Sequence, residues 1–142
     1  GYIQLNVTGT PMSLHRTWIR PDGKKADAKP ARMLAANHRT KGGVIRLWPD
    51  ECISFGLAVA EGIETTLSVA HAITPAWACI DAGNLAGFAV LSGVDSLVIA
   101  TDGDEVGRRA AKECAARWRR AGRQIAIVDP GDGRDWNDEV AK

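Results

Sequence analysis

Acidic side chains follow each of the apolar segments after residue 56. These strand-end acids are Glu61, Asp81, the pair Asp102 and Asp104, and Asp129. Carboxylates from separate segments that meet at one point repel one another unless a divalent cation lies among them. Mg²⁺ favours a few oxygen ligands together with waters and substrate phosphates. If the fold brings the acids together, the pattern predicts a metal-dependent site for phosphoryl transfer.

Each acid also has a purely structural interpretation. Glu61 can be simply the first residue beyond a strand. Glu64 suits the N-terminal dipole of the helix that follows, and Asp104 suits the N-cap of the next helix. The acidic segment 131–139 can be a solvated loop that caps a last helix. Because several such signals follow one another in order, the catalytic interpretation is the stronger one.

The elements that must position these acids alternate between strand and helix. Short apolar runs at 57–60, 76–80, 96–100 and 124–128 predict buried strands, and the spacing over 63–73 and 106–121 predicts helices. Gly122 is the expected C-cap of the second helix. Apolar strands that alternate with helices require crossover connections, and hence a parallel sheet whose carboxyl edge is the usual ligand site. We therefore predict an α/β fold with a central parallel sheet of about four strands flanked by helices.

The first 50 residues differ from the rest in composition and charge. They hold four of the six prolines and nine Lys or Arg against three acids, whereas residues 51–142 hold nine against fourteen. Alternation over 13–20, a turn signal at 21–24 and an apolar run at 43–48 predict strands and a hairpin. We divide the chain into a basic, β-rich N-terminal extension (1–50) and a catalytic domain (51–142). The charge asymmetry predicts a polyanion partner for the extension and cation chemistry in the domain.

Length and composition exclude several other classes of protein. The chain has 142 residues, 45% of them hydrophobic and 25% charged, as expected for one folded unit. Its three widely spaced cysteines (Cys52, Cys79 and Cys114) argue against a disulfide framework or a cysteine zinc site and favour free, mostly buried thiols. No apolar run approaches the roughly 20 residues of a membrane span, so we expect no membrane association and a cytoplasmic location. The absence of an initiator Met indicates a piece of a longer protein or a removed tag.

Together these features resemble the Toprim domain, the catalytic module shared by bacterial-type primases, type IA and type II topoisomerases and some nucleases. The resemblance covers about residues 57–140. Its marks are an apolar strand ending in Glu61-Gly62, a second ending in Asp102-Gly103-Asp104 with Gly107 and a helix behind it, and a third acidic patch at 133–138. The segments 61–65 and 135–138, and the extension from Leu14 to Leu47, are similar to the primases of phages, plasmids and integrated elements.

The chain departs from bacterial replicative primases at two positions. Thr65 stands where they carry an aspartate, and Asp135-Trp136-Asn137 stands where they carry Asp-Pro-Asp. Asn137 is a neutral ligand, so the number of metals and the acids that hold them stay open, and Asp138 or Glu64 can substitute.

The resemblance implies primer synthesis by Mg²⁺-dependent nucleotidyl transfer, with Mn²⁺ as an alternative ion. It implies that Asp102, Asp104, Asp135 and Asp138 hold metal, and that Glu61 shares it or acts as general base. Gly62 and Gly103 would keep the backbone compact near phosphates, while Asp81, Glu64 and Asn137 line the cleft. The expected partners are single-stranded DNA template and nucleoside triphosphates, whose phosphates would be held by the extension through Arg16, Arg20, Lys24, Lys25, Lys41 and Arg46.

The resemblance also implies a larger protein, with a zinc-binding module upstream and often a helicase-like region downstream. Because template selection would reside in the zinc module, the chain by itself need not polymerise nucleotides.

Three other functions remain alternatives. A nuclease or topoisomerase-related module would use the same metal site, but a topoisomerase needs a nucleophilic tyrosine and the only one is Tyr2. A non-catalytic scaffold for nucleic acid or protein is disfavoured by the retention of Glu61, Asp102 and Asp104. A phosphoacceptor receiver domain fits poorly, because its aspartate pair follows the first strand.

Overall fold

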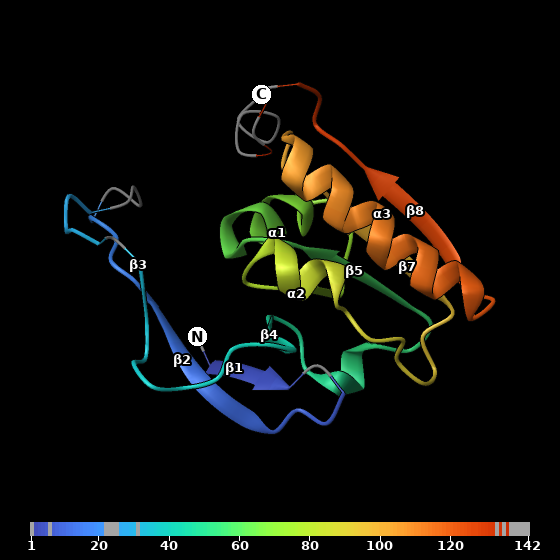
Figure 1. The fold of residues 1–142 in the computed structure, drawn as a ribbon, viewed down its shortest axis with the longest axis horizontal. Helices are drawn as coiled ribbons and strands as arrows, with labels where there is room; N and C mark the ends of the chain where they lie inside the picture. Colours follow the sequence, from blue (N-terminus) through green and yellow to red (C-terminus); the bar gives the residue numbers. More distant parts are fainter. Residues whose placement is uncertain are drawn as a thin grey trace.

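A single sheet runs through both the N-terminal extension and the rest of the chain (Figure 1). The computed structural model describes residues 2–5, 7–21, 26–30, 32–132, 134 and 136. Within these residues eight strands pair in the order β3-β2-β1-β4-β6-β5-β7-β8. The strands are β1 (Tyr2–Leu5), β2 (Pro11–Thr17), β3 (Arg32–Leu34), β4 (Gly43–Arg46), β5 (Gly56–Ala60), β6 (Ala76–Ala78), β7 (Ser96–Ala100) and β8 (Gln124–Val128). The helices are a 3₁₀ turn η1 (Asp50–Cys52), α1 (Ile63–Val69), α2 (Ala82–Ala86) and α3 (Glu105–Arg120).

Four neighbouring strands form the predicted parallel part of the sheet. β5 pairs in parallel with β6 on one side and β7 on the other, and β7 pairs in parallel with β8. The register sets Ala60 opposite both Ala78 and Ala100, and Ala100 opposite Val128. The carboxyl ends of all four strands are therefore level, and the residues after them emerge at one edge. This confirms the predicted α/β architecture.

The strands of the extension continue this sheet with antiparallel pairing. β4 pairs with β6, and β1 pairs with both β4 and β2. β2 also pairs with β3, which forms the edge of the sheet, and Figure 1 shows this end reaching away from the helices. The predicted strand at 13–20 is observed at Pro11–Thr17, and most of the expected turn at 21–24 lies outside the described residues. The boundary at residue 50 stays a prediction.

Alternation along β5 and β7 supplies two apolar faces, each covered by helix. Leu57, Val59, Leu97 and Ile99 belong to a cluster with α2 and α3, in which Trp118 stacks on Phe88 at 5.8 Å. Ala58, Ala60 and Ala100 lie in a second cluster with Val69 of α1. Small side chains on this second face let α1 approach the sheet closely, so that its N-terminus lies beside the ends of β5 and β7.

Two further sequence expectations can be compared with the structure. All three cysteines are free, with Cys79 and Cys114 buried and Cys52 exposed, which confirms the expectation of free, mostly buried thiols. Within the part of the chain that the structure describes, the helices are too short or too polar to cross a membrane.

Candidate active site

Glu61 lies at the centre of the acidic edge of the sheet. It directly follows β5, between the residues that follow β6 and β7. Burial and the charges of Asp102, Asp104 and Asp81 raise the pKa of Glu61 to about 7, while a hydrogen bond from the backbone of Ala82 acts in the opposite direction. The acids from three strands thus lie within electrostatic range of one another, as the parallel topology requires.

The Asp102–Asp104 turn presents two carboxylates that are each held by one oxygen. Thr65 Oγ1 on α1 donates to Asp102 Oδ1 at 2.7 Å. The Gly107 backbone N–H donates to Asp104 Oδ1 at 2.7 Å, so Asp104 is the N-cap of α3. The other oxygen of each carboxylate has no hydrogen-bond partner among the described residues. Asp104 therefore has the structural role that the sequence suggested and still presents a free oxygen at the edge of the sheet.

Close backbone packing fixes this turn from two sides. A Cβ at Gly103 would lie within 3.0 Å of the carbonyl oxygens of both Gly131 and Arg134. A Cβ at Gly107 would lie 3.1 Å from the carbonyl oxygen of Asp102. Gly62, by contrast, has room for a side chain, because its nearest neighbour is Glu64 Oε2 at 3.7 Å. Close approach thus requires glycine at 103 but leaves space at 62.

Two side chains that the sequence interpretation missed hold the last segment against the turn. The Trp136 indole N–H donates to the Thr101 carbonyl at 2.8 Å, and its ring packs against the apolar cluster beneath. Arg108 on α3 binds both Asp129 and Asp132, each at 2.6 Å. The Arg108 hydrogen bonds lower the pKa of Asp129 to about 2. A tryptophan within an acidic run, and an arginine four residues after Asp104, were the available signals.

Asp129 is thus bound by a cation on α3 instead of joining the other acids. The predicted ligands Asp135, Asn137 and Asp138 lie outside the described residues.

The donor set at this edge suits a hard divalent cation. In the described residues, no three His, Cys, Asp or Glu side chains form a ready-made metal cluster. Mg²⁺ does not need one, because it commonly binds through one or two carboxylates and keeps several waters. The free oxygens of Asp102 and Asp104 are of that kind, and a cation would stabilise the charged form of Glu61, whose pKa is raised by burial and by the neighbouring carboxylates. The residues therefore fit Mg²⁺ in chemistry.

A protein-family model matches the part of the chain that contains Glu61, Asp102 and Asp104. The family model described as Toprim domain matches residues 56–142, more than half of the chain. The chain belongs to the Toprim family. The predicted family is confirmed, and among curated protein sequences none matches the chain.

Two solved structures are similar to this chain in fold. A DNA primase domain from Pseudomonas aeruginosa is similar over 99% of this chain, with a TM-score of 0.56 and 16% identity. The Aquifex aeolicus primase, solved with its zinc binding and RNA polymerase domains, is similar over 99% with a TM-score of 0.62 and 17% identity. This chain spans 52% and 36% of those two chains, respectively.

An ion pair and a buried amide join the extension to the body of the chain, by which we mean residues 51–142. Arg32 on β3 pairs with Glu64 on α1 at 2.9 Å. The buried Asn84 accepts a hydrogen bond from the Gly42 N–H at 2.8 Å and donates to the Thr40 carbonyl at 3.1 Å. Asp81, the N-cap of α2, binds the Asn84 backbone. Glu64 and Asp81 therefore fix neighbouring elements around Glu61.

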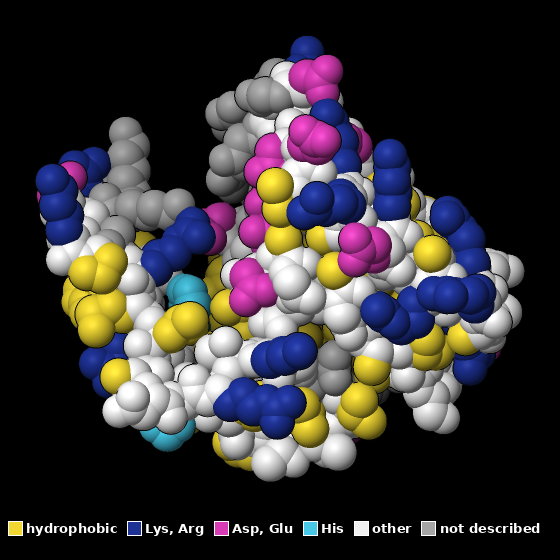
Figure 2. Space-filling view, viewed as in Figure 1, with side chains coloured by type: hydrophobic (Ala, Val, Ile, Leu, Met, Phe, Trp, Pro, Cys, Tyr) yellow, Lys and Arg dark blue, Asp and Glu magenta, His cyan; other side chains and the backbone are white. Residues whose placement is uncertain are grey.

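The basic residues predicted to bind phosphates are placed differently from one another. Arg16, Arg20 and Lys41 are exposed, whereas Lys24 and Lys25 lie outside the described residues. Figure 2 shows Lys and Arg side chains on the extension across a hollow from Asp and Glu side chains on the body. Arg46 is the exception, because only 8% of its side chain is exposed.

The Arg46 guanidinium is engaged within the protein. It pairs with Asp50, donates to the Leu5 carbonyl and lies 4.4 Å from the centre of the Trp77 ring. These contacts give Arg46 a packing role and leave its guanidinium poorly placed to bind the phosphates predicted for it.

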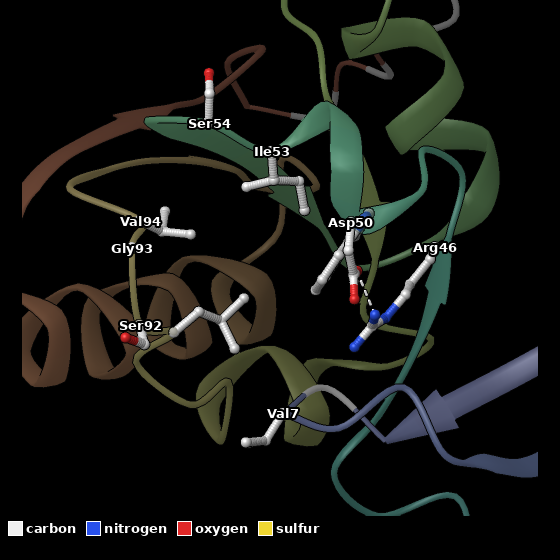
Figure 3. Close-up of a pocket in the computed structure, with 10 residues that line it drawn as sticks. Val7, Arg46, Asp50, Ile53, Ser54, Ser92, Gly93 and Val94 are labelled. Carbon is white, nitrogen blue, oxygen red and sulfur yellow. Dashed lines mark hydrogen bonds and ion pairs between the residues drawn. The ribbon is translucent and has the colours of Figure 1, made fainter.

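Arg46 and Asp50 also line a cavity of about 320 Å³ (Figure 3). Val7, Ile53 and the loop at 92–94 form its other walls. Ser54 and Val94 precede β5 and β7, so this cavity lies at the amino ends of the strands, opposite the edge that carries Glu61. It is therefore separate from the candidate active site.

Proposed function

We propose that this chain is the catalytic Toprim module of a DNA primase, which joins nucleotides on a single-stranded DNA template. The observation that carries the proposal is the level carboxyl edge of the parallel strands, where Glu61, Asp102 and Asp104 emerge, in a chain of the Toprim family. The fold similarity to two primase structures supports it.

Each residue of the site has a separate task in this proposal. Asp102 and Asp104 would hold Mg²⁺, with Asp135 and Asp138 as further ligands. When bound, the ion supplies positive charge next to the α-phosphate under attack. Thr65 orients the Asp102 carboxylate. Glu61 either shares the ion or accepts the proton of the attacking 3′-hydroxyl.

The extension supplies the proposed contacts to template and nucleotide. Arg16, Arg20 and Lys41 are exposed cations, and Lys24 and Lys25 add two more in the same stretch of sequence. Such contacts would bind phosphates without reading bases, so template affinity should fall steeply with salt. In the whole protein we expect an upstream zinc-binding module, a downstream helicase-like region and a cytoplasmic location. An origin in a phage, plasmid or integrated element stays a prediction from the sequence.

The first experiment measures metal binding at the acids. Mg²⁺ and then Mn²⁺ are titrated into ¹⁵N-labelled chain while amide shifts are followed. We expect saturable shifts at residues 61–65 and 101–105 that disappear in the double variant Asp102→Asn, Asp104→Asn. Asparagine at 104 still caps α3, so this variant removes charge without removing the cap. Glu113→Gln on the outer part of α3 is the matched control and should leave the shifts unchanged.

The second experiment tests the reaction itself. Labelled nucleoside triphosphates are incubated with the chain, Mg²⁺ and a single-stranded DNA carrying a short annealed primer. Extension that is lost in the double variant supports the primase assignment, whereas metal-dependent cleavage of the DNA supports the nuclease alternative. If neither metal moves any amide at the acidic edge at millimolar concentration, the catalytic proposal is wrong and a scaffold role replaces it.

A further inference from the structure

The basic residues of the body gather on one helix. Residues 51–142 carry nine Lys or Arg against fourteen acids, yet seven of those nine lie between positions 108 and 123. α3 itself has six basic and two acidic residues, a net charge of +4 within an acidic domain. Figure 2 shows these Lys and Arg side chains over the surface of the body that Figure 1 assigns to α3. The charge of the body is therefore strongly polarised.

Three of these cations are fully available to an external partner. Arg109, Lys112 and Arg119 are exposed and have no hydrogen-bond or ion-pair partner among the described residues. Arg120 is also exposed, and among the described residues its side chain hydrogen-bonds only to the Ala116 carbonyl of its own helix. We call these four residues the α3 row. At 1.5 Å per residue, the row extends over about 16 Å along one side of the helix.

The remaining basic residues of this region are already engaged within the protein. Arg108 binds Asp129 and Asp132. Arg117 donates to the carbonyls of Ala86 and Phe88, and Arg123 pairs with Asp95. The structure thus separates internal cations from the outward-facing α3 row.

We propose that the α3 row binds the phosphodiester backbone of duplex nucleic acid. A rigid line of cations suits the regular, closely spaced phosphates of a duplex, which carries one charge per about 1.7 Å of its axis. Binding of single strands relies on exposed aromatic side chains for base stacking, and the one aromatic residue of α3, Trp118, is fully buried. An acidic protein would require apolar anchors at the centre of its interface, whereas the exposed apolar side chain of α3, Val106, lies in the first turn, outside the span of the row.

The position of the row connects it with the acidic edge. α3 begins at its N-cap Asp104, and Arg109 lies little more than one helical turn further on. A duplex on the row would therefore run away from the Asp102–Asp104 turn. Duplex binding by the α3 row does not depend on catalysis and can be measured without metal or nucleotide.

The test measures binding of a fluorescent 16-base-pair duplex of mixed sequence in EDTA. The neutral variant carries Arg109→Gln, Lys112→Gln and Arg119→Gln, three exposed helical positions at which glutamine maintains helix propensity. We expect duplex binding to weaken tenfold or more at about 0.1 M salt. The slope of log affinity against log salt should become shallower by about 3, since three phosphate contacts are lost.

Two control variants keep the result interpretable. Arg109→Lys with Arg119→Lys preserves the charge and should bind within about twofold of the unmodified chain. Glu113→Gln adds one positive charge to the same helix and should tighten binding, which tests the proposal even if the neutral variant folds poorly.

Three results would overturn the proposal. Unchanged duplex affinity in the neutral variant would show that the row is only a solvated face. An equal loss of affinity for a 16-nucleotide single strand would remove the assignment to duplex. Tighter binding of polyglutamate than of duplex, lost in the same variant, would indicate an acidic protein partner. None of these results bears on the Mg²⁺ titration at the acids, so failure here is distinguishable from failure of the proposed function.

Discussion

Substitution of Gly103 by alanine tests how the Asp102–Asp104 turn is held. The new Cβ would lie 2.9 Å from the Arg134 carbonyl oxygen and closer still to that of Gly131, whereas ordinary contact begins at 3.4 Å. Both neighbours are backbone, so at least 0.5 Å of movement must come from the segment 131–134 or from the turn itself. Overpacking of this kind costs about 2 kcal/mol.

That free energy corresponds to a measurable change in melting temperature. An unfolding entropy of about 2.1 cal/mol/K per residue gives about 0.3 kcal/mol/K for this chain, so Gly103→Ala should lower the Tm by about 7 °C. Gly56→Ala is the matched control, because its Cβ would meet only Ser96 at 3.7 Å and beyond. The control should melt within about 2 °C of the unmodified chain. Circular dichroism at 222 nm follows both transitions.

Fluorescence gives a local measurement of the same strain. Trp136 is held at the Thr101 carbonyl, and displacement of the segment should release its indole into water and shift its emission to the red. The same comparison in a Trp136→Phe background isolates its signal from the other four tryptophans. If Gly103→Ala melts within about 2 °C of the unmodified chain and Trp136 emission is unchanged, close packing does not hold this turn.

Three other substitutions test contacts around the site. Thr65→Val leaves Asp102 Oδ1 without its donor and should lower the free energy of unfolding by about 1 kcal/mol in urea denaturation; no measurable loss would remove the orienting role. Asn84→Asp replaces the donor to the Thr40 carbonyl with an acceptor and should cost about 2 kcal/mol and speed exchange of the Gly42 amide; normal protection of that amide would contradict it. Arg108→Gln should lower the free energy of unfolding only slightly at pH 7, because solvent screens these partly exposed ion pairs. Since the pKa of Asp129 is lowered from 3.8 to about 2 in the folded chain, the stabilisation by Arg108 is present above pH 3.8 and is lost as pH falls through 2. A difference in stability between the unmodified chain and Arg108→Gln that persists below pH 2 would refute this role of the ion pair.

Local sequence signals predicted the elements that form independently of distant contacts. β7, β8 and α3 have long apolar or helical patterns, and each is observed within a residue of its expected bounds. α1 ends at Val69, four residues before the end of its apolar spacing, and a tight turn follows it. α2 was missed, because its five residues include Gly83 and gain much of their stability from the Asp81 cap and the contacts of Asn84 with residues 40–42. β1 was missed because four residues near the end of a chain carry too little pattern, and it forms through pairing on both sides.

The sequence by itself determined that Glu61, Asp102 and Asp104 follow buried parallel strands, and hence that they emerge at one edge of the sheet. That information is local, because apolar runs, turns and helical spacing can be read from neighbouring residues. Only the tertiary structure decided which partner each side chain has. In the structure Thr65 donates a hydrogen bond to Asp102, Arg108 pairs with Asp129, and Arg32 pairs with Glu64. The Arg46 side chain, which the sequence predicted to bind phosphates, is instead buried and packs within the protein. Apart from the local pair Arg46 and Asp50, these partners lie 21 to 37 positions apart in the sequence. The charge or type of one residue does not specify which distant side chain will lie opposite it.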